Sequence, residues 1–309
     1  RGLVALRDVW EGQELLFVPN SAILWPSKAR ELRIGEDLAA RGASQGCLLA
    51  VCLLLAEKGL LDTSEPSQLL KLRECYAATL PPVEDCGHFP LFWDLERSAD
   101  LLAEVERCFC VAQPAAAVVF EAIEQLQERI DAEYQLLRAS VASLRSSREA
   151  EALDVSRERY FWARTMVLSR SFSNPNAVVG EEQGRGGGYG DDDQMFLVPF
   201  ADLVNHASAT SAERGLPVPN AVFDYNGHRD GFVLEATRTI PSGDEIWIRY
   251  GRKSALDLFL RYGFVPDVAC LSSDAYPELH ALDVHLNCPR QRLVLALAGE
   301  EDGKQGETE

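Results

Sequence analysis

The sequence lacks several patterns that would assign the chain to other classes of protein. Its eight cysteines include no pair at CxxC spacing, which argues against a zinc ribbon or a disulfide framework. No apolar run reaches the ~18 residues that cross a bilayer, and the longest one, Cys47–Ala56, is predicted to be a buried helix. Basic residues are few: 30 Lys and Arg against 48 Asp and Glu give a net charge of −18. A nucleic-acid groove, which needs clustered basic residues, is therefore not expected.

The composition that remains is typical of a globular protein inside a cell. Of the 309 residues, 47% are hydrophobic and 25% are charged, which is enough for one large domain or two smaller ones. Several cysteines lie in apolar helical contexts, where a reduced thiol packs as a small hydrophobe. The acidic balance suits a basic peptide or a basic protein as partner. No targeting segment is visible, but Arg1 already stands inside a predicted hairpin, so we expect that the native start is missing and leave the compartment, chloroplast or cytoplasm and nucleus, undecided.

Hydrophobic periodicity divides the chain into a helical part and a part rich in short strands. Apolar residues at helical spacing predict helices over residues 44–59, 115–144 and 156–168. Short β-rich segments separated by turn residues follow at residues 195–200, 220–225, 231–236 and 245–250. No strand leads through a Gly-rich turn into a helix, so no Rossmann sheet is expected. The sequence therefore predicts an α+β fold.

Four segments carry the candidate chemistry. Residues 200–206 place Asn205 and His206 directly after an apolar run, and residues 243–251 run from a Gly-Asp turn to Tyr250 and Gly251. Residues 257–264 end on Tyr262-Gly263-Phe264, and residues 1–19 read as an opening β-hairpin with a turn at Glu11-Gly12. In this order, with a long helical stretch inside, they resemble the SET-domain protein methyltransferases of the Rubisco large-subunit methyltransferase-like class. Other SET enzymes carry a cysteine-rich zinc segment after the domain, which this sequence lacks.

The resemblance implies a SET-domain β-fold with a knot-like core, interrupted by an all-helical insert. It divides the chain into a first SET part at residues 1–26, the insert at 27–158, a second SET part at 159–266, and the start of a C-terminal helical region with an acidic tail at 267–309. It also implies transfer of a methyl group from S-adenosylmethionine to a lysine of a protein substrate, with S-adenosylhomocysteine as product and no metal. No membrane or direct nucleic-acid partner is implied, and the oligomeric state is left open.

The resemblance also carries roles to single residues. Tyr250 would align the acceptor amine with the methyl donor, since positioning of this kind is worth on the order of 7–11 kcal/mol. The donor-binding residues would be Arg1, Gly2, Leu3, Arg170, Asn205, His206, Tyr250 and Phe264, with Arg170 on the donor carboxylate through paired hydrogen bonds. The acceptor side would be lined by Asp202 and by three aromatic residues, whose faces favour cationic amines. These are Phe172, Phe223 and Tyr262.

Each assignment has a structural alternative. Tyr250 and Phe264 would otherwise be core aromatics, Asp202 a cap for its turn, and Arg170 a helix-end residue bonded to terminal carbonyls. At the level of function, the alternatives are a histidine acceptor and a SET-derived interaction subunit with weak or no turnover. The second alternative is motivated by a C-terminal region too short to be the helical domain with which this class grips its protein substrates.

Overall fold

A computed structural model describes residues 2–61, 67–95, 113–145, 147–173, 195–207, 217–251 and 253–264. Arg1 and the region 267–309, both named in the predictions above, lie outside these residues. The α-helices are α1 (Pro26–Arg30), α2 (Arg33–Ala40), α3 (Gln45–Glu57), α4 (Ser67–Thr79), α6 (Gln113–Ser143), α7 (Arg148–Ala152), α8 (Arg157–Arg170) and α9 (Ala255–Tyr262). Short 3-10 helices are η1 (Asn20–Ala22), η2 (Val83–Cys86), η3 (Pro90–Phe92) and η7 (Ala201–Leu203). The strands are β1 (Glu14–Pro19), β2 (Phe172–Ser173), β3 (Met195–Phe196), β4 (Asn205–His206), β5 (Ala221–Asn226), β6 (Gly231–Ala236) and β7 (Trp247–Ile248).

The chain forms two compact units. The first contains residues 1–80, 130–206 and 219–248, and the second contains residues 81–129, 207–218 and 249–309. These bounds follow spatial contacts rather than family segments, so the predicted division at residues 26, 158 and 266 stays a prediction. The described part of residues 27–158 consists of helices and turns without a strand.

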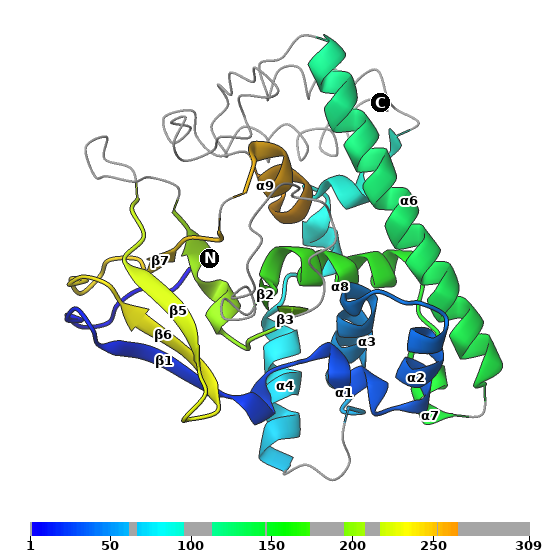
Figure 1. Cartoon of the computed structure of the whole chain (residues 1–309), viewed down its shortest axis with the longest axis horizontal. Coiled ribbons are helices and arrows are strands. Elements are labelled where there is room, and N and C mark those ends of the chain that lie inside the picture. The colour runs from blue at the N-terminus through cyan, green and yellow to red at the C-terminus, as the bar shows by residue number, and fades with distance from the viewer. Residues whose placement is uncertain are drawn as a thin grey trace, which may run out of the picture. The chain divides into compact units, whose positions relative to one another are not determined.

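The main sheet of the first unit has three antiparallel strands, with β6 between β1 and β5 (Figure 1). In its register Val18 lies opposite Phe232, and Phe223 lies opposite Leu234. Two smaller pairs accompany it: β2 with β3, antiparallel, and β4 with β7, parallel. Mostly antiparallel strands beside separate helices make the fold α+β, as the sequence predicts.

The expected opening hairpin is wrong in its pairing. A turn at Trp10–Gln13 does reverse the chain, since the Gln13 amide donates to the Trp10 carbonyl at 3.0 Å. The two arms, however, pair with later segments: Val4 with Glu245, Val9 with Ile240, and β1 with β6. An isolated two-stranded hairpin is marginal in water. Pairing with residues 231–246 instead gives both arms backbone partners; Val9 and Ile240, for example, exchange two hydrogen bonds of 2.9 Å.

The helical core of the first unit is built around α3. Every residue from Gly46 to Ala56 is buried, as the run of apolar side chains predicts, and α3 packs against α1, α4 and α8 (Figure 1). Ser44 caps the helix by accepting from the Cys47 amide at 3.0 Å. Gly59 follows the end of the helix with a φ of +64°, a conformation that glycine adopts without strain.

Helix α8 ends at Arg170 and delivers it to the candidate site. It begins at the cap Ser156 and is buried from Tyr160 to Leu168. Inside the first unit, Glu133 of α6 accepts from Arg164 Nε at 2.7 Å and from the Tyr160 hydroxyl at 3.2 Å. This buried ion pair joins α6 to the middle of α8. Among the described helices, none is long and apolar enough to cross a membrane.

Candidate active site

Asn205 and His206 form the short strand β4 next to β7. Asn205 pairs with Trp247 and His206 with Ile248, in parallel register. The Asn205 side-chain amide donates to Glu245 Oε1 at 2.6 Å, and His206 is buried. The Asn-His segment and the Gly-Asp-Glu strand, 40 residues apart, therefore meet in the folded chain.

The N-terminal arm, residues 2–9, packs against Asn205 and Glu245. A Cβ atom on Gly2 would lie 2.2 Å from Glu245 Oε1 and 2.7 Å from Asn205 Nδ2, so only glycine fits without moving these side chains. The Leu3 carbonyl accepts from the Ile246 amide at 2.8 Å. The structure thus brings four predicted donor-binding residues together: Gly2, Leu3, Asn205 and His206.

Asn220, which no sequence pattern marked as functional, holds the segment from Glu245 to Trp247 in place. It is 5% exposed, its amide donates to the Glu245 carbonyl at 2.9 Å, and its side-chain oxygen accepts from the Trp247 amide at 2.7 Å. Because both the nitrogen and the oxygen of this buried side-chain amide are hydrogen-bonded, Asn220 fixes the backbone conformation at Glu245. A single asparagine before a predicted strand does not indicate that its side chain binds a segment 25 residues away.

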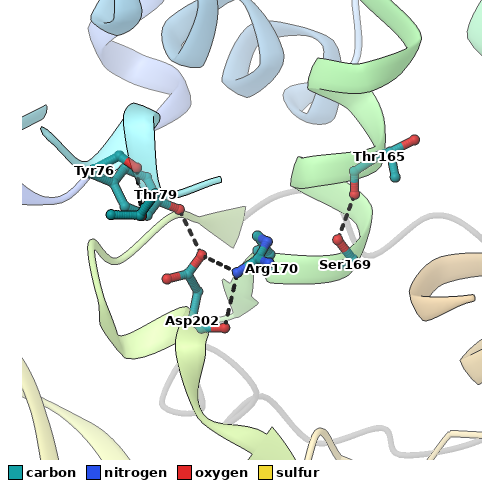
Figure 2. A network of polar contacts seen from close by, with 6 residues as sticks. All are labelled: Tyr76, Thr79, Thr165, Ser169, Arg170 and Asp202. Carbon is teal, nitrogen blue, oxygen red and sulfur yellow. Dashed lines mark hydrogen bonds and ion pairs between the residues drawn. The ribbon is translucent and has the colours of Figure 1, made fainter. Parts of the chain in front are cut away.

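Arg170 and Asp202 form an ion pair, and Tyr76 completes it from α4. Arg170 Nη1 donates to Asp202 Oδ2 at 3.0 Å and to the Asp202 carbonyl at 3.4 Å. The Tyr76 hydroxyl donates to the same Oδ2 at 3.0 Å. Figure 2 shows Asp202 between the two partners. The alternative of a turn cap is wrong for Asp202, since the cap of η7 is Phe200 and the Asp202 carboxylate is bound by side chains.

The electrostatics of this pair follow from burial. The Asp202 side chain is 0% exposed and that of Arg170 is 21% exposed. Desolvation raises the pKa of the Asp202 carboxyl above its ordinary value, and the Arg170 charge opposes that rise. Desolvation, followed by the Asp202 charge, also raises the pKa of Tyr76 well above its ordinary value, so the Tyr76 hydroxyl stays protonated at neutral pH and donates the hydrogen bond to Asp202.

The two phenylalanines expected on the acceptor side meet in one aromatic cluster. The ring centroids of Phe172 and Phe223 are 4.9 Å apart at 77°, and Phe172 is also 4.9 Å from Phe232. Phe172 is buried, whereas Phe223 is half-buried on β5. The rings of Phe223 and Phe232 stack with centroids 5.5 Å apart at 13°, so Phe223 lies on the face of the main sheet that Phe172 packs against.

The remaining predicted residues belong to the second unit. The rings of Tyr250 and Tyr262 stack with centroids 4.8 Å apart at 29°, and Phe264 lies 6.2 Å from Tyr262. Burial raises the pKa of Tyr262 above its ordinary 10.0, so its hydroxyl stays protonated. Gly263 ends α9 with a φ of +69°, and a Cβ there would lie 2.8 Å from the His88 ring. Within the described residues, no group of three or more potential metal ligands occurs.

Comparison with known proteins places these observations in a family. Residues 1–251 match the family model described as the SET domain. The chain is 25% identical over 268 residues to the chloroplastic ribulose-1,5 bisphosphate carboxylase/oxygenase large subunit N-methyltransferase of Nicotiana tabacum, covering 85% of this chain and 45% of the relative. It is 29% identical over 266 residues to the N-lysine methyltransferase SETD6 of Homo sapiens, covering 85% of this chain and 48% of the relative.

A solved structure agrees on the fold. The SET domain of LSMT bound to methyllysine and S-adenosylhomocysteine superposes with a TM-score of 0.58 at 20% identity, over 87% of this chain and 51% of that one. The predicted SET-type α+β fold with helical segments is confirmed. The chain spans about half the length of the curated relatives it matches.

Proposed function

The chain belongs to the SET-domain family, and we propose that it transfers a methyl group from S-adenosylmethionine to a lysine side chain of a protein. The observation that carries this proposal is the convergence of Gly2, Asn205 and Glu245 around the β4–β7 pair. Two of its relatives are named as N-methyltransferases of proteins, and one similar structure holds methyllysine and S-adenosylhomocysteine.

The residues of the first unit suit a donor with an adenosine end and an amino-acid end. Asn205 and His206 would hold the donor beside the Gly2–Leu3 backbone, where the absence of a side chain allows a close approach. Arg170 would bind the donor carboxylate, since a guanidinium matches a carboxylate with two parallel hydrogen bonds. From the second unit, Phe264 is proposed to pack on the adenine. When bound, the donor supplies an electrophilic methyl group on a sulfonium.

The aromatic residues suit the acceptor. Methyl transfer needs the lysine amine as a neutral lone pair, in line with the methyl group. Tyr250, stacked on Tyr262, would orient the amine, and the rings of Phe172 and Phe223 would favour a cationic methylated lysine by about 0.5–2 kcal/mol per contact. Asp202, paired with Arg170, would brace the segment between the acceptor side and Asn205. The chain's net charge of −18 favours a basic stretch of substrate.

Titration calorimetry with S-adenosylhomocysteine tests the donor half of the proposal. We expect saturable heat and a thermal shift, because a ligand that binds only the folded state stabilises it. The absence of both at saturating ligand would remove the enzyme interpretation.

Transfer of radiolabel from S-adenosylmethionine into lysate proteins tests the second half. Amino-acid analysis of the labelled product distinguishes methyllysine from methylhistidine. Donor binding without any transfer would instead support the interaction subunit that keeps the donor as a structural element.

A further inference from the structure

We propose that Tyr76 is a positioning residue for donor binding, which acts through Asp202 to orient Arg170 toward the donor carboxylate. The inference rests on the proposed function, because it requires that Arg170 bind that carboxylate. Three separate elements carry it: Tyr76 lies on α4, Asp202 in η7 and Arg170 at the last position of α8 (Figure 2).

The Asp202 carboxylate is held by these two neighbours. Oδ2 accepts from the Tyr76 hydroxyl and from Arg170 Nη1, both at 3.0 Å. Oδ1 is buried and has no hydrogen-bond partner among the described residues. Loss of the Tyr76 hydroxyl would therefore leave a buried carboxylate with Arg170 as its remaining side-chain partner, free to turn about its own bonds.

Tyr76 itself is well anchored. It is 1% exposed, and its ring meets that of Phe200 edge-on, with centroids 6.2 Å apart at 73°. Phe200 stands in the left-handed region with a φ of 69°, directly before the turn that carries Asp202. The ring contact fixes the start of η7 while the hydroxyl fixes its carboxylate. Tyr76 of α4 thus holds both the residue that precedes η7 and the carboxylate in its middle.

The Arg170 side chain is long and flexible, so its orientation depends on contacts such as those to Asp202. An arginine side chain loses rotamer entropy when it is ordered, and ordering it before the ligand arrives strengthens binding. Both contacts to Asp202 use Nη1, so they fix the direction of the whole planar group. A correctly directed guanidinium can then present a parallel pair of N–H groups to a carboxylate.

The test compares two buried tyrosines and two ligands. Tyr76→Phe removes the hydroxyl and keeps the ring against Phe200. The matched control is Tyr160→Phe, which removes another buried hydroxyl that donates to a carboxylate, Glu133 Oε2 at 3.2 Å, away from Arg170. Each protein is titrated with S-adenosylhomocysteine and with 5′-methylthioadenosine, which keeps the adenosine and the sulfur but has no amino-acid end.

For Tyr76→Phe we expect S-adenosylhomocysteine to bind about three- to tenfold more weakly, with the affinity for 5′-methylthioadenosine unchanged. Tyr160→Phe should leave both affinities as in the wild type. A donor KM that rises by the same factor with an unchanged kcat would agree. In the Arg170→Ala background, Tyr76→Phe should cause no further loss.

Two results would overturn the inference: an unchanged affinity for S-adenosylhomocysteine, or an equal loss for both ligands, which is the signature of a merely structural role. If Tyr76→Phe does not fold, Asp202→Asn takes its place with the same two ligands and the same two overturning results. Failure of the proposed function is distinct, because the wild type would then not bind S-adenosylhomocysteine at all.

Discussion

The Asn205 side chain donates a 2.6 Å hydrogen bond to Glu245, although 40 residues separate them in the sequence. The bond orients the Asn205 amide, since it directs the amide nitrogen at Glu245. Gly2 lies against both side chains. A contact between two polar residues thus joins the N-terminal arm, β4 and the segment before β7.

Glu245→Ala should weaken donor binding without unfolding the protein. The change removes the acceptor of the Asn205 amide, and such a loss costs about 1 kcal/mol, or roughly a fivefold lower affinity. Titration with S-adenosylhomocysteine measures it. Glu235→Ala is the control, because that glutamate is exposed on β6. Equal affinities in the two variants would mean that Glu245 does not orient Asn205.

Arg170→Ala should bind the donor about ten- to a hundredfold more weakly, since a hydrogen bond to a charged group is worth about 1.5–3 kcal/mol. Arg157→Ala on the same helix is the control: its pair with Asp131 is at the surface, with side chains 55% and 36% exposed. Calorimetry at equal salt compares them. If Arg170→Ala retains full affinity, the arginine serves only to pair with Asp202.

Tyr250→Phe should separate turnover from binding. The ring and its stack on Tyr262 remain, so the affinity for S-adenosylhomocysteine should change by less than about twofold, whereas kcat should fall by on the order of a hundredfold or more because orientation of the amine is lost. Single-turnover methyl transfer measures the second quantity. Tyr225→Phe, on β5, is the control. Loss of donor affinity in Tyr250→Phe would assign the hydroxyl a structural role.

The buried thiols should be inert toward alkylation near neutral pH. Burial raises the pKa of Cys47 and of Cys52 to about 12, whereas Cys75 is exposed. The thiolate is the reactive form, and a raised pKa leaves almost none of it at pH 8. Iodoacetamide followed by peptide mass mapping should therefore modify Cys75 before Cys47 and Cys52. In denaturant the three should react alike; early labelling of Cys52 in the folded protein would contradict its burial.

The sequence by itself determined the local structure and the family. Helices α3, α6 and α8 follow from apolar residues at helical spacing, and their caps Ser44 and Ser156 are visible as serines before the run. Helices can be predicted in this way because each helical hydrogen bond joins residues four positions apart, so a short stretch of sequence contains the whole pattern. The order of the Asn-His, Gly-Asp-Glu and Tyr-Gly segments was sufficient to recognise a SET domain.

Only the tertiary structure decided which distant residues meet. The N-terminal arm pairs with residues 240–246 instead of its own hairpin partner, and Tyr76 reaches Asp202 across 126 positions. Backbone pairing groups are the same in every strand, and one buried hydroxyl looks like any other in a sequence. Partners over such distances are selected by how the apolar faces of whole elements pack. The hydrogen bond from Tyr76 to Asp202 could therefore not be predicted from the sequence.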